Sequence, residues 1–112
     1  RWDPRVLDDY VAAGFVERDG HVELAFDRGI ETKLYNTLPH TLGRMLRHHP
    51  PKCPVGFVAG TQSAEMRQGG VEASRALAKE RFVWIEGTHL YPMERPDETA
   101  RIVLDLLAGM GA

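Results

Sequence analysis

His89 lies a few residues after an apolar segment, residues 81–85, and a histidine in such a loop can act as a general base. In that role one ring nitrogen faces the hydroxyl of a nucleophile, while a carboxylate holds the other nitrogen. Ser63 and Glu65 add a hydroxyl and a carboxylate after a second apolar segment, residues 55–59. A lone loop histidine is more often a capping or space-filling residue. The sequence that flanks His89 is therefore the evidence for or against a catalytic role.

Apolar segments in the second half of the chain predict a parallel sheet covered by helices. The elements expected there, in chain order, are a strand at residues 55–59, a loop around Gly69-Gly70, a helix at 71–79, a strand at 81–85 and a last helix from Pro96. Nearly all-apolar strands that alternate with helices are typical of parallel sheets buried on both faces. We therefore expect Trp84, within the second strand, to lie in the core.

The first half of the chain predicts helices around a short hairpin. We expect a helix at 4–13 that begins at Asp3-Pro4, two short strands joined at Asp19-Gly20, a helix at 30–38 that Pro39 interrupts, and a further helical stretch that ends before Pro50. These boundaries follow from the helix-starting role of proline, the turn preference of Asp-Gly, and the inability of proline to continue a helix.

Composition excludes several classes of protein. Fourteen basic and sixteen acidic residues are interspersed over 112 residues, a formal charge of −2, so we expect no nucleic-acid partner. No apolar run approaches the roughly 20 residues of a transmembrane helix. Cys53, the single cysteine, is expected to be partly buried, and its isolation fits a reducing, cytoplasmic setting. His40, His48 and His49 match no metal-site spacing, and we expect neither a metal nor another cofactor.

The sequence Gly87-Thr88-His89, followed by Glu94-Arg95-Pro96 and an amphipathic helix, resembles the C-terminal motif of α/β-hydrolases. In that family a glycine-x-histidine sequence closes the last strand, the histidine is the general base of the catalytic triad, and a Glu-x-Pro pair leads into the last helix. The resemblance implies that His89 is the catalytic histidine and that Glu94 caps or pins the last helix. It also implies that the strand before Gly60 is the penultimate strand.

The opening sequence, from Trp2-Asp3-Pro4 to Gly14-Phe15, resembles the lid of a lipase-like and epoxide-hydrolase-like branch of that family. The implied fold is α/β: residues 1–50 form lid helices and a short hairpin, and residues 51–112 form the last two parallel strands with their flanking helices. Two strands cannot bury both faces of a sheet, and the chain opens without a methionine. We therefore expect residues N-terminal to Arg1 to complete the sheet.

Two members of the triad are not evident. The nucleophile elbow, G-x-S-x-G, does not occur, so we expect the nucleophile in the N-terminal remainder of the protein. The family's Gly-x-x-Asp acid pattern reads Gly60-Thr61-Gln62-Ser63 here, and a serine cannot supply the charge. Either Glu65 substitutes as the acid, or the acid comes from the end of the preceding strand, upstream of Arg1; we favour the second. Ser63 then serves the turn or hydrogen-bonds near the histidine.

The resemblance implies a serine-type hydrolase, esterase-like or lipase-like, that acts on ester-like bonds of a small apolar acyl substrate. Thr88, Leu90 and Tyr91 are candidates to line the substrate site. An aspartate nucleophile would instead give epoxide hydrolase or dehalogenase chemistry. The alternative is a ligand-binding or interaction protein on the same fold with a degraded triad, which Ser63 favours. A free-standing α/β interaction module is disfavoured by the incomplete sheet.

Overall fold

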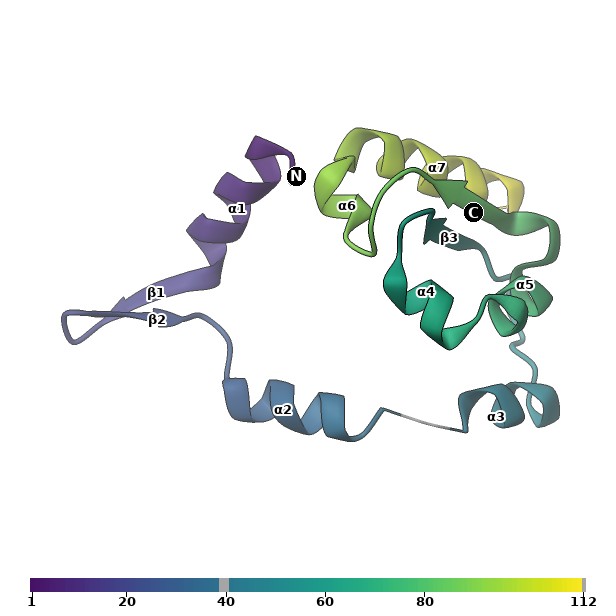
Figure 1. Ribbon diagram of the computed structural model, residues 1–112, viewed down its shortest axis with the longest axis horizontal. Helices are drawn as coiled ribbons and strands as arrows, with labels where there is room; N and C mark the ends of the chain where they lie inside the picture. Colours follow the sequence, from purple (N-terminus) through teal and green to yellow (C-terminus); the bar gives the residue numbers. More distant parts are fainter. Residues whose placement is uncertain (39–40, 112) are drawn as a thin grey trace.

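The computed structural model describes residues 1–38 and 41–111, which form helices and two small sheets in a mixed α/β arrangement (Figure 1). The elements, in chain order, are α1 (Pro4–Gly14), β1 (Phe15–Arg18), β2 (His21–Leu24), α2 (Arg28–Asn36), α3 (Leu42–His48), β3 (Phe57–Gly60), α4 (Ala64–Gly69), α5 (Glu72–Ala78), the 3-10 helix η1 (Lys79–Arg81), β4 (Phe82–Ile85), α6 (Tyr91–Glu94) and α7 (Pro96–Gly109). Figure 1 shows α1 to α3 running as an arc outside the part formed by β3 to α7.

The arc begins with a capped helix and a hairpin. Asp3 caps α1, because its carboxylate accepts a hydrogen bond from the backbone N–H of Arg5 at 2.9 Å. β1 and β2 pair antiparallel, with Arg18 opposite His21 across the predicted turn. The backbone N–H of Asp3 also donates to the carbonyl of Met93 at 2.8 Å, which joins the start of the chain to α6.

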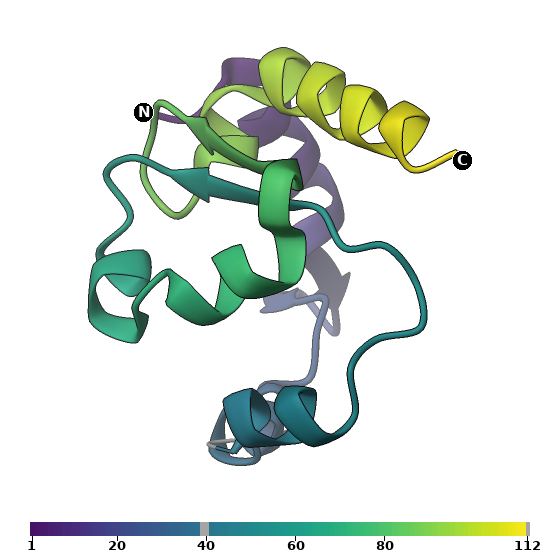
Figure 2. The same ribbon diagram turned by 90° about the vertical axis from the view of Figure 1, so that its right-hand side faces the viewer.

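The second half of the chain contains a parallel pair of strands. β3 pairs with β4 in register, from Phe57 opposite Phe82 to Gly60 opposite Ile85. Figure 2 shows α7 on one side of this pair and α4 with α5 on the other. The predicted parallel pairing is therefore confirmed, and helices lie on both sides of it, as parallel strands require.

Burial is concentrated around the ends of these two strands. Ala59, Ala78 and Ile85 form the apolar core, with exposed fractions of 1%, 0% and 2%. Among the described residues, every fully buried one lies between Ala59 and Gly87. The best-packed part of the chain is thus the part that carries the loops after β3 and β4.

The loop expected around Gly69-Gly70 is largely a helix, which corrects the sequence prediction. α4 spans only six residues before it ends at this glycine pair, where Gly70 has φ of 75°. A helix of that length is too short to show a helical repeat of apolar residues. The short helix α6 is a second element that the sequence did not predict, for the same reason.

Two expectations about burial are also wrong. Trp84 is 42% exposed, because its side of β4 is covered only in part, with the guanidinium of Arg75 5.9 Å from the centre of its ring. Cys53 is exposed, since it lies in the loop before β3 and not in the core. The expected helix interruption at Pro39 lies outside the described residues, as does His40.

The chain is open, and it leaves many apolar side chains in contact with solvent. Its radius of gyration is 17.2 Å, whereas a compact chain of this length has about 13 Å. Large apolar residues more than two-fifths exposed occur along α1, α2 and α7, and include Leu7, Val11, Ile30, Leu34, Tyr35, Leu104 and Leu107. Exposed apolar surface of this extent is uncommon on a monomeric soluble domain.

Replacing Gly60 by alanine is predicted to destabilise the protein by about 1–3 kcal/mol, because the new Cβ would collide with rigid backbone. That atom would meet the carbonyl oxygens of Thr88 and Gly87, the latter at 2.7 Å. Gly109→Ala is the matched control: its Cβ meets nothing within 4 Å, and the change should be neutral or slightly stabilising. Urea unfolding of both variants measures the difference, and equal stabilities would contradict the predicted collision.

Candidate active site

The loops after β3 and β4 are held together by backbone contacts. The N–H of Thr61 donates to the carbonyl of Ile85 at 2.9 Å, and the N–H of Gln62 donates to the carbonyl of Gly87 at 2.8 Å. Gly87 has φ of 145°, a value that side chains disfavour, and a Cβ there would meet Oε2 of Glu94 at 2.6 Å. The glycine therefore allows the sharp turn that brings the loop from β4 over the end of β3.

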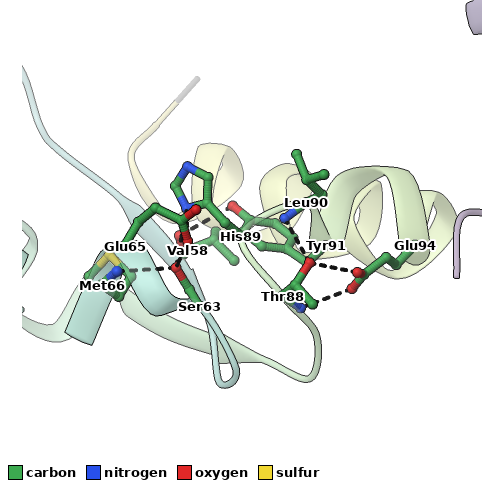
Figure 3. A network of polar contacts seen from close by, with 9 residues as sticks. All are labelled: Val58, Ser63, Glu65, Met66, Thr88, His89, Leu90, Tyr91 and Glu94. Carbon is green, nitrogen blue, oxygen red and sulfur yellow. Dashed lines mark hydrogen bonds and ion pairs between the residues drawn. The ribbon is translucent and has the colours of Figure 1, made fainter. Parts of the chain in front are cut away.

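Glu94 pins this loop, and its role differs from the predicted one. Its carboxylate accepts hydrogen bonds from the N–H of Thr88 at 2.9 Å and from the hydroxyl of Thr88 at 2.6 Å (Figure 3). The Thr88 hydroxyl in turn accepts a hydrogen bond from the N–H of Leu90 at 3.1 Å. Glu94 thus fixes the residues on either side of His89, and does not cap α7.

Ser63 is the buried polar residue of the site. Ser63 is the last residue of the loop between β3 and α4. Its side chain caps α4, because Oγ accepts a hydrogen bond from the N–H of Met66 at 3.1 Å. The residue is only 1% exposed. Its hydroxyl also donates to Oε2 of Glu65 at 3.1 Å and lies 3.2 Å from Nδ1 of His89. The turn role and the contact with the histidine, both considered from the sequence, therefore occur together.

Glu65 lies on the same side of the imidazole as Ser63. Its Oε2 atom is 3.8 Å from Nδ1 of His89, and its side chain is 59% exposed. Its own backbone N–H is the main cause that lowers the pKa of this carboxyl, and the Ser63 hydroxyl and the positive charge of a protonated His89 lower it further. Glu65 is therefore ionised at neutral pH and supplies a negative charge beside the histidine.

His89 itself presents its two ring nitrogens to different surroundings. Figure 3 shows one nitrogen turned toward Ser63 and Glu65, and the other turned away from them. The side chain is 57% exposed. The arrangement can therefore hold the imidazole by Nδ1 and offer Nε2 to a reacting group.

The predicted substrate-lining residues are arranged in three different ways. Thr88 is engaged by Glu94, and Leu90 is 46% exposed beside His89. The Tyr91 hydroxyl donates to the carbonyl of Val58 at 3.2 Å, and partial burial raises the pKa of this tyrosine. Tyr91 thus braces the loop against β3, so of the three only Leu90 presents an exposed side chain that is free to meet a substrate.

An open cavity of about 360 Å³ lies beside Ser63, and it was not predicted from the sequence. Its apolar lining includes Met66, Val71 and Trp84, residues that come from α4, the turn before α5, and β4. Met66 belongs to the helix that the apolar repeat could not predict, so the cavity could be found only from the structure.

The described residues include no group of three or more histidine, cysteine, aspartate or glutamate side chains placed to hold a metal ion. Within residues 1–38 and 41–111, no helix has both the length and the apolar character that crossing a bilayer requires.

Glu94→Gln is predicted to reduce the loss of stability that the protein shows in acid. The hydroxyl of Thr88, followed by its backbone N–H, lowers the pKa of Glu94 below its ordinary 4.5. A lowered folded-state pKa contributes stability above the unfolded value, and that contribution disappears as pH falls through the folded value. Unfolding free energies measured from about pH 6 down to pH 3 should fall less steeply in this variant.

Glu23→Gln, at an exposed carboxylate of β2, is the control and should keep the wild-type slope. If Glu94→Gln and Glu23→Gln follow the same pH dependence as the unaltered protein, the hydrogen bonds to Thr88 do not stabilise the loop.

Comparison with known proteins found no relative of this chain. The chain matched no protein-family model, no curated protein and no solved structure. The resemblance of the Gly87-Thr88-His89 segment to α/β-hydrolases therefore stays a prediction from the sequence.

Proposed function

We propose that this chain is the C-terminal part of an α/β-hydrolase and that His89 is the general base of a serine-type hydrolase of ester-like bonds. The observation that carries the proposal is the orientation of the imidazole. Nδ1 lies 3.2 Å from the Ser63 hydroxyl and 3.8 Å from the Glu65 carboxylate, and the other ring nitrogen points away from both. A histidine held at Nδ1 with Nε2 available is what a triad histidine requires.

The position of the site in the fold supports the same proposal. β3 and β4 are parallel, so their carboxyl ends meet at one edge. Ser63 and His89 lie in the loops that follow these ends, and Glu65 lies in the first turn of α4 directly after Ser63. Ligands of open parallel α/β sheets bind in a crevice outside the carboxyl ends of the strands. The loop is also held in place by Glu94, and a fixed imidazole is more effective than a mobile one in proton transfer.

The nucleophile is proposed to be a serine in another part of the same protein. Ser63 is a poor candidate, because it is 1% exposed and its hydroxyl already donates to Glu65. In the proposed reaction the serine oxygen bonds to the acyl carbon, and its proton moves to Nε2 of His89. The bond to the leaving oxygen then breaks, and Nε2 returns the proton to that oxygen. In the second half of the reaction, the oxygen of a water molecule bonds to the acyl carbon and a proton of the water moves to Nε2. The bond to the serine oxygen then breaks, Nε2 returns the proton to the serine, and the acid is released.

The exposed apolar side chains support the proposal that other parts of the protein pack against this chain. Trp84 on β4 is 42% exposed, and apolar residues along α1 and α2 face solvent. We propose that further strands complete the sheet and that residues 1–50 form part of a lid over an apolar acyl substrate. Residues 51–112 then form the end of the hydrolase core.

A second candidate is a ligand-binding or interaction protein on the same fold that has lost catalysis. Ser63 favours it, since the residue stands where the family's pattern has an aspartate. The exposure of Glu65, 59%, also favours it, because an exposed carboxylate is screened by water. A fluorophosphonate, which reacts preferentially with an activated serine, separates the two candidates.

His89→Ala is predicted to slow fluorophosphonate labelling of the protein that contains this chain by about 10²- to 10⁴-fold, the usual contribution of a general base. His21→Ala is the matched control, because His21 is an exposed histidine at the β1–β2 turn. It should label at the wild-type rate.

Labelling can be followed by intact mass under denaturing conditions. Rapid labelling that both histidine variants retain would show that His89 is not the base. If the folded protein takes no label at all, the proposal of a serine-type hydrolase fails.

A further inference from the structure

We infer that Ser63 and Glu65 together replace the acid of the triad: Ser63 fixes the tautomer of His89, and Glu65 provides the negative charge through the Ser63 hydroxyl. The catalytic meaning of this arrangement rests on the proposed function, whereas the tautomer of His89 does not. Ser63 is a positioning residue, because it acts through the histidine and does not touch a substrate. Glu65 is then the source of the negative charge. This differs from the sequence prediction, which favoured an acid upstream of Arg1.

The hydrogen count at Ser63 carries the inference. A serine hydroxyl has one hydrogen to donate and two lone pairs that accept. The hydrogen goes to Oε2 of Glu65 at 3.1 Å, and one lone pair accepts from the N–H of Met66 at 3.1 Å. The remaining lone pair faces Nδ1 of His89 at 3.2 Å. Only a protonated Nδ1 can make a hydrogen bond there, which leaves Nε2 unprotonated in the neutral ring.

The direction of the hydroxyl depends on the charge of Glu65. An ionised carboxylate only accepts hydrogen bonds, so the Ser63 hydroxyl has to be the donor in that contact. The lowered pKa of Glu65 keeps it ionised at neutral pH. If Glu65 were protonated, Ser63 could accept from it and donate to Nδ1, which would give the wrong tautomer for a base.

Ser63 and Glu65 can also stabilise the protonated imidazole of His89. When Nε2 takes a proton, Nδ1 keeps its own and still donates to Ser63, so no proton moves within the pair. Oε2 of Glu65, 3.8 Å from Nδ1, then forms an ion pair with the imidazolium without a change of rotamer. Buried Ser63 holds the end of the exposed Glu65 side chain in the position where this ion pair forms.

The tautomer can be measured directly. Two-bond ¹H–¹⁵N correlation spectra of the protein labelled at its histidine rings, recorded at about pH 8.5 where an ordinary histidine is neutral, distinguish Nδ1–H from Nε2–H. We expect mainly Nδ1–H for His89, and a change to mainly Nε2–H in Ser63→Ala. Ser63→Thr, which keeps a hydroxyl, should restore the wild-type pattern. A dominant Nε2–H form in the unaltered protein would overturn the inference.

Control variants distinguish a direct effect of Ser63 on the tautomer of His89 from an effect of losing the helix cap. Ser63→Ala also removes the cap of α4, so Asp27→Ala, which removes the cap of α2 far from His89, is the matched change. It should leave the His89 signals in place. Glu65→Gln keeps the side-chain length and the helix, and it tests the charge without relying on the Ser63 variant. Its control is Glu31→Gln, which alters a carboxylate in the first turn of α2.

Labelling by the fluorophosphonate distinguishes failure of the inference from failure of the proposed function. We expect Ser63→Ala and Glu65→Gln each to slow labelling about tenfold or more, with Glu31→Gln and Asp27→Ala unchanged. If only His89→Ala slows it, the hydrolase stands and the acid lies elsewhere, which overturns the inference. If no variant labels but Ser63→Ala changes the tautomer, the tautomer part of the inference holds and the hydrolase proposal fails.

Discussion

The loops after β3 and β4 approach so closely that Gly60 has no room for a side chain. A Cβ on Gly60 would strike the carbonyls of the opposite loop. The polar contacts of the site depend on this approach, since it brings the residues after one strand within hydrogen-bond distance of those after the other. Ser63 and His89 are 26 positions apart in the chain, yet their side chains are 3.2 Å apart.

The polar residues of the site have different roles, which follow from their charge and their burial. Glu94 orders the loop through Thr88, so that the backbone at His89 is fixed before any ligand binds. Ser63 is buried and therefore makes its contacts without competition from water, whereas Glu65 brings a charge from an exposed position. A buried carboxylate in place of Ser63 would carry a desolvation cost that the serine avoids. The arrangement is one way to place negative charge near an imidazole without burying it.

Much of the fold could be predicted from the sequence, and the reasons for the exceptions are physical. The parallel strands were predictable because their apolar runs are bounded by Gly60 and Gly87, and α1 because Asp3-Pro4 starts a helix. α4 and α6 are too short for an apolar repeat to appear. The exposure of Trp84 could not be predicted, because burial depends on which elements lie against a strand. His89 could be selected by its flanking residues, but the partners of its Nδ1 atom depend on the positions of loops far apart in the chain.

The most direct measurement is a crystal structure of the protein that contains this chain, determined after reaction with a fluorophosphonate. If His89 is the general base, the adduct lies on a serine outside these 112 residues, with Nε2 of His89 within hydrogen-bond distance of an adduct oxygen and Nδ1 still facing Ser63. An adduct on Ser63, or an imidazole turned so that Nδ1 faces the adduct, would show that His89 does not act in this way.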